Sequence, residues 1–222
     1  MKVVAFVPIK MNSERLPNKN ILPFEGGEPL IKYILRTLLD VQGVDERYVY
    51  CSDPSIKNYL IEGIDFLQRS AHLDLSSTPF NEVLISFAQE VPADFYVLTH
   101  TTAPFIRASS IDKGIQKVID GSFDSAVGVQ RIQEFLWRDG KPLNFELTNI
   151  PRTQDLPLIY AETCGLYIYS RQLILEQKRR IGNNPYFIEL SNLESIDINN
   201  REDFDFANAI FKQIILKGRK DE

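Results

Sequence analysis

Short apolar runs alternate with amphipathic stretches along most of the chain. Residues 3–9 read Val-Val-Ala-Phe-Val-Pro-Ile, a continuous run typical of a buried strand. Composition and turn signals predict further strands at residues 47–51, 64–67, 94–99, 124–129 and 161–169. Apolar residues at helical spacing predict helices at residues 29–40, 79–90 and 109–119. This alternation of strands and helices indicates an α/β fold.

Two later stretches depart from this pattern. Residues 130–159 mix polar, aromatic and proline residues, and Asp139-Gly140 predicts a tight hairpin turn there. Residues 195–199 are expected to form a strand that places Asp197 and Asn199 on one face. An amphipathic helix should follow, with Asn200 near its N-cap.

In the helix at 79–90 the aromatic residues are expected to be core rather than a surface for stacking ligands.

Basic residues are concentrated directly after the first predicted strand. Lys10, Arg15 and Lys19 lie within ten residues of one another. In an open parallel sheet, ligands bind outside the carboxyl ends of the strands. A single basic residue is usually just a solvated side chain. Three of them at this position predict a loop that binds phosphate groups.

Composition narrows the class of protein. The 222 residues suffice for one globular domain with a sizeable core. The net charge of −5 argues against a general nucleic-acid binder. Cys51 and Cys164 provide neither a disulfide framework nor a metal cluster, and suit a reducing compartment. With no leader pattern and no apolar run near the ~18 residues of a membrane span, a cytoplasmic protein is expected. Residues 217–220 are expected to be a frayed tail.

The basic loop also resembles a known signature. Residues 8–20 read Pro-Ile-Lys-Met-Asn-Ser-Glu-Arg-Leu-Pro-Asn-Lys-Asn. They resemble the Pro-Ala-Arg-x-x-Ser-x-x-x-Pro-x-Lys-Asn motif of the sugar-acid cytidylyltransferases, the acylneuraminate family, and of the related ketodeoxyoctonate enzymes. Lys10 stands where the family usually has arginine, which keeps the charge but loses the bidentate fork. Weaker matches extend the resemblance from Val3 to about Ala209.

The resemblance implies a Rossmann-like nucleotidyltransferase fold, a three-layer α/β sandwich with a mainly parallel sheet. Residues 1–222 would form a single domain, with a protruding dimerisation insertion at about 131–160. The implied reaction transfers CMP from CTP to the anomeric hydroxyl of a 2-keto sugar acid, a sialic-acid-like nonulosonate, and releases pyrophosphate. Mg²⁺ is the implied cofactor, and a homodimer is the implied assembly.

The resemblance also assigns roles near the nucleotide. Lys10, Arg15 and Lys19 would act in catalysis by steadying the triphosphate and the departing pyrophosphate. The nucleotide-binding residues would be Pro8, Lys10, Asn12, Ser13, Lys19, Asn20 and Arg69. Residues 68–70 resemble the family's arginine-bearing loop beside the base and ribose, although Arg69 could equally be an exposed residue at a strand end. Asp53, after the second strand, is expected to cap the helix that follows.

Acceptor and metal roles come from three further segments. Residues 100–107 resemble the family's Leu-Gln-Pro-Thr-Ser-Pro-Leu-Arg segment. His100 stands in place of the glutamine. Residues 152–157 resemble Arg-x-Gln-x-Leu-Pro, whose guanidinium suits a carboxylate or phosphate. The implied substrate-binding residues are His100, Thr102, Arg107, Arg152, Gln154 and Tyr160. The family's Ile-Asp-Ile-Asp motif implies Asp197 and Asn199 as metal ligands, with the triphosphate supplying further oxygen atoms.

Several alternatives stay open at this point. Phosphate-binding residues do not read the base, so a nucleotidyltransferase that uses another nucleoside triphosphate or a sugar phosphate is one. A non-catalytic nucleotide-binding dimer is another, suggested by Lys10, Cys164 and Asn199, which depart from the family pattern. Cys164 replaces an asparagine of the family, and with no base nearby in the sequence we expect a packed thiol rather than a nucleophile. Neuraminate, legionaminate, pseudaminate and ketodeoxyoctonate acceptors fit these residues equally.

Overall fold

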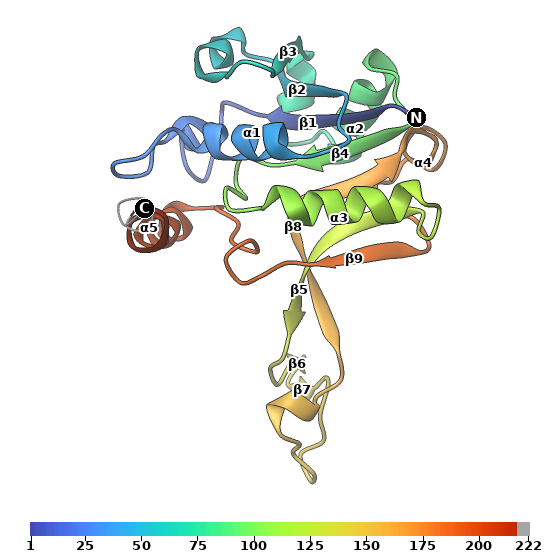
Figure 1. The fold of residues 1–222 in the computed structure, drawn as a ribbon. Helices are drawn as coiled ribbons and strands as arrows, with labels where there is room; N and C mark the ends of the chain where they lie inside the picture. The colour runs from blue at the N-terminus through green and yellow to red at the C-terminus, as the bar shows by residue number, and fades with distance from the viewer. Residues whose placement is uncertain (217–222) are drawn as a thin grey trace.

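A seven-stranded sheet forms the centre of the computed structural model, which describes residues 1–216 (Figure 1). The strand order is β3-β2-β1-β4-β8-β5-β9. The strands are β1 (Val3–Ile9), β2 (Glu46–Cys51), β3 (Asp65–Gln68), β4 (Phe95–Thr99), β5 (Ser125–Ile132), β8 (Ile159–Ser170) and β9 (Pro185–Glu189). Only β8 runs antiparallel to its neighbours in this sheet. The expected α/β fold with a mainly parallel sheet is confirmed.

Helices cover both faces of the sheet, giving three layers. On one face α1 (Leu30–Asp40) and α3 (Ala108–Ile119) bury their apolar stripes against the strands. On the other face α2 (Phe80–Glu90) and α4 (Arg171–Gln177) do the same. The helix α5 (Arg201–Ile210) and the π-helical turn Phe211–Leu216 close a third cluster, which includes Phe24, Phe204 and Phe211. Burial of these stripes, rather than helix propensity, holds the layers together.

The predicted elements agree with the structure except near the C-terminus. The helix α4 and the strand β9 were not predicted. The strand expected at residues 195–199 is wrong, because Ser195 lies in a turn and residues 196–199 belong to no strand. This stretch is tied to the turn after β4 by the Ile198 amide, which donates to the Thr102 carbonyl at 2.8 Å. Asp53 accepts a hydrogen bond from the Ser55 amide and caps the 3₁₀ helix at Pro54–Tyr59, as expected.

An arm, residues 131–160, projects away from the sheet (Figure 1). The ladder between β5 and β8 runs out to the pair Ile132 and Ile159, so these strands carry the arm. Within the arm β6 (Trp137–Arg138) pairs with β7 (Lys141–Pro142). Asp139 and Gly140 have φ angles of 51° and 75°, so both occupy the left-handed region that a tight hairpin turn requires. The predicted hairpin is therefore confirmed.

Two predictions concern membrane spans and the C-terminal tail. No helix within residues 1–216 is long and apolar enough to cross a membrane. The predicted tail at residues 217–220 lies outside the described residues.

Candidate functional site

A cleft of about 480 Å³ opens beyond the carboxyl end of β1. β1 lies between β2 and β4 and is parallel to both, so three strands end at this edge of the sheet. The chain moves outward from β1 to β2 and β3, then returns to β4 on the other side of β1. Such a switch in direction leaves a crevice between the loops that follow the two strands. The loop after β1 and the segments after β3 and β4 line the cleft.

Lys19 is the most buried of the predicted phosphate-binding cations. It begins a short 3₁₀ helix, Lys19–Ile21, and only 8% of its surface is exposed. Its ammonium group donates to the Ile198 carbonyl at 2.9 Å. Burial lowers the pKa of Lys19, nearby Asp197 opposes the shift, and Arg15 adds to it. A desolvated ammonium with one carbonyl partner has donors left for an anionic ligand.

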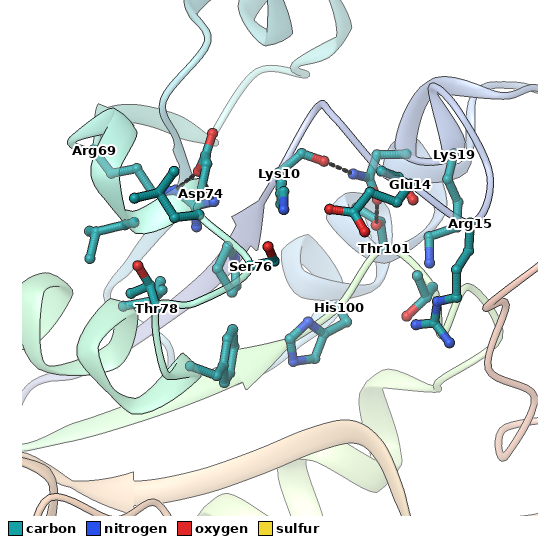
Figure 2. Close-up of a pocket in the computed structure, with 18 residues that line it drawn as sticks. Lys10, Glu14, Arg15, Lys19, Arg69, Asp74, Ser76, Thr78, His100 and Thr101 are labelled. Atoms are coloured by element: carbon teal, nitrogen blue, oxygen red, sulfur yellow. Dashed lines mark hydrogen bonds and ion pairs between the residues drawn. The ribbon is translucent and has the colours of Figure 1, made fainter.

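Asn20 holds the basic loop in place. Its side-chain amide donates to the Lys10 carbonyl at 2.9 Å, and its oxygen accepts a hydrogen bond from the buried Thr101 hydroxyl (Figure 2). These bonds connect both ends of the loop to the segment after β4. The importance of Thr101 was not predicted, because the family has proline at this position and the residue carries no charge that draws attention.

His100 lies in the cleft beneath Lys10, whose side chain extends into it (Figure 2). The His100 ring centroid is 5.4 Å from that of Phe80. Burial, followed by the nearby charge of Arg180, lowers the pKa of His100 to about 4. The imidazole is therefore neutral at pH 7 and can donate one hydrogen bond and accept another. Phe80 packs against the core cluster, as expected for the aromatic residues of this helix, and it also lines the cleft beside His100.

Arg69 is buried, with 4% of its surface exposed, so the alternative of an exposed strand-end residue is wrong. Its guanidinium forms an ion pair with Asp74, with the Nε donating at 3.0 Å. The guanidinium carbon also lies 6.0 Å from the Tyr50 ring centroid. Ser76 and Thr78 line the same wall of the cleft (Figure 2). Arg69 thus borders the cleft with its charge already balanced by a carboxylate.

A second cleft of about 370 Å³ adjoins the first. The two share lining residues, namely Arg15, Lys19, Phe80, His100 and Thr102. The second cleft adds Cys164, Tyr167, Arg180, Asp197 and Asn199. Because the walls are shared, two ligands bound in the two clefts would meet near the basic loop.

Cys164 is exposed and borders the second cleft, so the expected packed thiol is wrong. The cause is an irregularity in the ladder between β5 and β8. Val127 pairs with Tyr167, whereas Val129, only two residues later, pairs with Glu162. The extra residues on β8 bulge outward. Cys164 lies within this bulge, in the left-handed region with a φ of 57°.

Asp197 and Asn199 form a small polar unit with Arg15. The Arg15 Nη2 donates to the Asn199 Oδ1 at 2.9 Å, and the Asn199 Nδ2 donates to the Asp197 Oδ2 at 2.8 Å. No group of three or more His, Cys, Asp or Glu side chains within residues 1–216 could hold a metal ion. A single carboxylate beside a phosphate-binding loop nevertheless fits Mg²⁺, which often binds one or two carboxylates and the substrate's phosphates.

The predicted residues do not all meet in the clefts. The first cleft is lined by Pro8, Lys10, Ser13, Arg15, Lys19, Asn20, Arg69, His100 and Thr102. Asn12 and Arg107 are exposed and line neither cleft. Arg152, Gln154 and Tyr160 lie on the arm, where Arg152 forms an ion pair with Asp155 and the Tyr160 hydroxyl donates to Glu189. The predicted roles of these five residues stay predictions.

Arg180 and Tyr167 in the second cleft were not predicted as site residues. In the sequence, Tyr167 is part of a predicted apolar strand, so nothing marks it as a site residue. Arg180 belongs to the basic run Lys178-Arg179-Arg180, which looks like a solvated helix end. Only the fold shows that the third residue of the run turns inward, with 24% of its side chain exposed.

Comparison with known proteins agrees with this geometry. Residues 4–214 match the family model described as cytidylyltransferase. N-acylneuraminate cytidylyltransferase of Oncorhynchus mykiss is 26% identical, with 97% of this chain and 50% of that protein covered. The N-acylneuraminate cytidylyltransferase of Streptococcus agalactiae serotype III (strain NEM316) is 21% identical, with 92% and 52% covered. The chain therefore spans about half the length of these curated relatives.

Two solved structures share the fold. CMP:2-keto-3-deoxy-manno-octonic acid synthetase complexed with CTP superposes with a TM-score of 0.70 at 17% identity, covering 96% of this chain and 99% of that one. The 4-diphosphocytidyl-2C-methyl-D-erythritolsynthase of Anaerococcus prevotii DSM 20548 gives a TM-score of 0.69 at 13% identity, covering 96% of each chain. At these identities the likeness concerns the fold alone.

Proposed function

This chain belongs to the cytidylyltransferase family, and we propose that it transfers CMP from CTP to the anomeric hydroxyl of a 2-keto sugar acid, releasing pyrophosphate. The observation that carries the proposal is the position of Lys10, Arg15 and Lys19, which border one cleft at the carboxyl end of β1. Curated relatives named N-acylneuraminate cytidylyltransferase favour a sialic-acid-like nonulosonate as the acceptor.

The two clefts suggest how the substrates are arranged. The triphosphate of CTP would lie against Lys10 and Lys19, with the base toward the wall formed by Arg69, Ser76 and Thr78. The acceptor would occupy the second cleft. Its anomeric hydroxyl would then face the α-phosphorus from the side opposite the pyrophosphate, as an in-line displacement requires.

Charge stabilisation is the main task of the protein in this reaction. The acceptor oxygen forms a bond to the α-phosphorus while the bond to the oxygen bridging the α- and β-phosphates breaks. Pyrophosphate takes the electron pair of that bond, and the proton of the acceptor hydroxyl passes to solvent water. Lys10, Arg15 and Lys19 would balance the negative charge that gathers on the phosphate oxygens. His100, with a pKa of about 4, is too weak a base to take the hydroxyl proton efficiently, so it would orient a substrate by hydrogen bonding.

Asp197 is the residue that would hold Mg²⁺ together with the triphosphate. When bound, the ion would neutralise phosphate charge and lower the pKa of a coordinated hydroxyl. Asn199 bridges Arg15 and Asp197 through its amide, so it would keep the carboxylate turned toward the cleft. The Asn199 oxygen could itself serve as a ligand only after leaving Arg15.

The arm supports a homodimer. Its exposed apolar side chains are Trp137, Leu143, Leu147, Ile150 and Leu158. A projecting element with this much uncovered apolar surface is typical of an interface, and a second copy of the chain is the simplest partner. In such a dimer Arg152 and Gln154 would reach the partner's second cleft and contact the acceptor there.

Pyrophosphate release tests the proposal. CTP, UTP, GTP and ATP are each incubated with Mg²⁺ and with N-acetylneuraminate or 3-deoxy-manno-octulosonate, and Asp197→Ala serves as the inactive control. We expect turnover with CTP and one sugar acid, lost in the variant. Turnover with another nucleotide would favour a related nucleotidyltransferase, and CTP binding without turnover on any acid would favour a non-catalytic nucleotide-binding dimer.

A further inference from the structure

We propose that Arg180 binds the carboxylate of the acceptor, so that the chain itself, and not only a partner's arm, recognises the acid. This inference rests on the proposed function, and it names the anion that the second cleft takes. Arg180 follows α4 in the connection to β9 and lines this cleft together with Cys164 and Tyr167. The other cations there, Arg15 and Lys19, come from the loop after β1.

The Arg180 side chain is held firmly in place. Its guanidinium carbon lies 4.1 Å from the ring centroid of Tyr167 and 5.6 Å from that of Phe80. Its Nη2 donates to the Tyr167 hydroxyl at 3.1 Å and to Glu162 at 3.2 Å. The Tyr167 hydroxyl in turn donates to Glu162. Contacts with aromatic faces fix the guanidinium plane, so the ordering cost of binding a ligand is largely met in advance.

The guanidinium still has donors to offer. Both of its hydrogen bonds come from Nη2, and no acceptor for Nε or Nη1 lies within residues 1–216. Within this part of the chain Nε is buried and has no partner. Nη1 also has no partner there, but it is not buried. A planar carboxylate accepts from two guanidinium nitrogens at once. Nη1 keeps both of its N–H donors for a ligand, and a carboxylate that also engages Nη2 would replace Glu162 or Tyr167 as an acceptor there.

The charges lining the second cleft favour an anion, although Glu162 already pairs with Arg180. Arg15, Lys19 and Arg180 face it, with Asp197 as the acidic lining residue. The triphosphate would occupy Arg15 and Lys19, which belong to the basic loop. Arg180 comes from the connection after α4 and not from that loop, so it would serve the other substrate. The positive field of Arg180 also contributes to the low pKa of His100, the residue shared by both clefts.

The chemistry of the acceptor explains why this contact would matter. In a 2-keto sugar acid, the carboxylate is attached to the anomeric carbon that carries the attacking hydroxyl. A residue that fixes the carboxylate therefore fixes the direction of the hydroxyl toward the α-phosphorus. Arg180 would determine specificity for acids over neutral sugars, and it would position the nucleophile without touching the transferred phosphorus.

The two histidines of the chain provide a direct binding assay. His100 borders both clefts, whereas His72 is exposed and hydrogen-bonded to Ser70 outside them. N-acetylneuraminate, or its uncharged methyl ester, is titrated into the CTP-loaded protein without Mg²⁺ while the histidine NMR signals are followed. The variants are Arg180→Met, Arg180→Lys and the matched control Arg179→Met. The Arg179 guanidinium bonds Gln177 and Asn183 and lines neither cleft.

We expect the acid to shift the His100 signals in the wild type and in Arg179→Met, with His72 unchanged. Affinity for the acid should fall about tenfold or more in Arg180→Met and less in Arg180→Lys, which keeps the charge without the fork. The ester should bind the wild type and Arg180→Met equally weakly. A CTP-induced shift of His100 that persists in Arg180→Met shows that this variant is folded.

The proposal is overturned if the acid binds Arg180→Met as tightly as the wild type, if the ester binds the wild type as tightly as the acid, or if the acid leaves His100 unshifted. Pyrophosphate release, measured on the same proteins with Mg²⁺, reports on the proposed function separately. Arg180-dependent binding of the acid without turnover would reject the activity and retain the carboxylate site.

Discussion

The cleft beside β1 and the projecting arm both contain residues that resemble one family's motifs, but they differ in how those residues are held. In the cleft, Lys19 and Asn20 are buried and bonded to segments far away in the sequence. On the arm, Arg152 is exposed, and among residues 1–216 its side chain bonds only its near neighbour Asp155. The cleft residues are bonded across the fold, whereas Arg152 is bonded within a short turn of the arm.

This difference shows when the role of a motif residue can be inferred from the structure of a single chain. Buried polar residues require partners that the fold itself supplies, since an unpaired buried group is costly. Exposed residues on an arm carry no such requirement, and a second chain can supply the partner. If that explanation is correct, changes in the cleft should affect the chain that carries them, and changes on the arm should affect the partner's reaction.

The largest effect is expected from Lys19→Met. The substitution removes a buried charge that would face the triphosphate, and loss of one preorganised donor of this kind costs about 10²–10³ in kcat. Steady-state pyrophosphate release measures the effect, with Lys113→Met, at an exposed position on α3, as the control. If both variants retain wild-type kcat, the basic loop does not bind the reacting phosphates.

Mixing two variants tests the arm. Arg152→Ala alone should reduce activity by about a hundredfold, since a carboxylate or phosphate loses its bidentate partner. If Arg152 serves the partner's cleft, then refolding Lys19→Met with Arg152→Ala in equal amounts restores about one quarter of wild-type activity, because half of the dimers contain one intact site. No recovery in the mixture would mean that Arg152 acts within its own chain or has no role.

The sequence predicts the parts of the site that follow from local pattern. The apolar run at residues 3–9 predicts a buried strand. The cations after it border the cleft because parallel strands end at the same edge of the sheet. Arg180 could not be predicted in the same way. Its place in the cleft depends on the packing of Tyr167 and Phe80, which come from β8 and α2.

Cys164 illustrates the same limit. A thiol in an apolar strand normally packs inside, but the bulge opposite Val127 and Val129 turns this one outward. Register irregularities arise from pairing between strands distant in sequence, so alternation along one strand does not reveal them. The segment around Asp197 departs from prediction in the opposite way. Its residues alternate like those of a strand, but no neighbouring strand pairs with it.

Acid titration should distinguish the interior of the cleft from exposed histidine surface. The pKa of His100 is lowered from 6.5 to about 4, so between these values the unfolded chain binds more protons than the folded one. This residue therefore makes the free energy of unfolding fall as the pH drops from 6.5 toward 4, by at most ~1.4 kcal/mol per pH unit, and adds no slope above that range.

Urea denaturation at several pH values measures the slope for His100→Gln and for the exposed control His72→Gln. The first variant should lose the contribution between pH 6.5 and 4, and the second should behave like the wild type. Equal slopes in the wild type and His100→Gln would show that the cleft does not keep this imidazole from protonation.

The smallest expected effect contrasts a helix cap near the cleft with the turn at the tip of the β6–β7 hairpin. Asn200 accepts from the Asp203 amide at 3.0 Å, and the Asp203 carboxylate accepts from the Asn200 amide at 3.0 Å, which together form a capping box for α5. Asn200→Ala should lower the free energy of unfolding by ~1 kcal/mol, a fall in Tm of roughly 2–4 °C.

Gly140→Ala provides the matched change on the arm. Its added methyl group meets no neighbour within 4 Å, so the cost comes only from the left-handed backbone at a φ of 75°. Because α5 packs into a core cluster while the hairpin does not, calorimetry should show a lower Tm for Asn200→Ala and a smaller change for Gly140→Ala. Equal shifts would mean that the arm unfolds together with the sheet, and the contrast between the two regions would then hold for chemistry but not for stability.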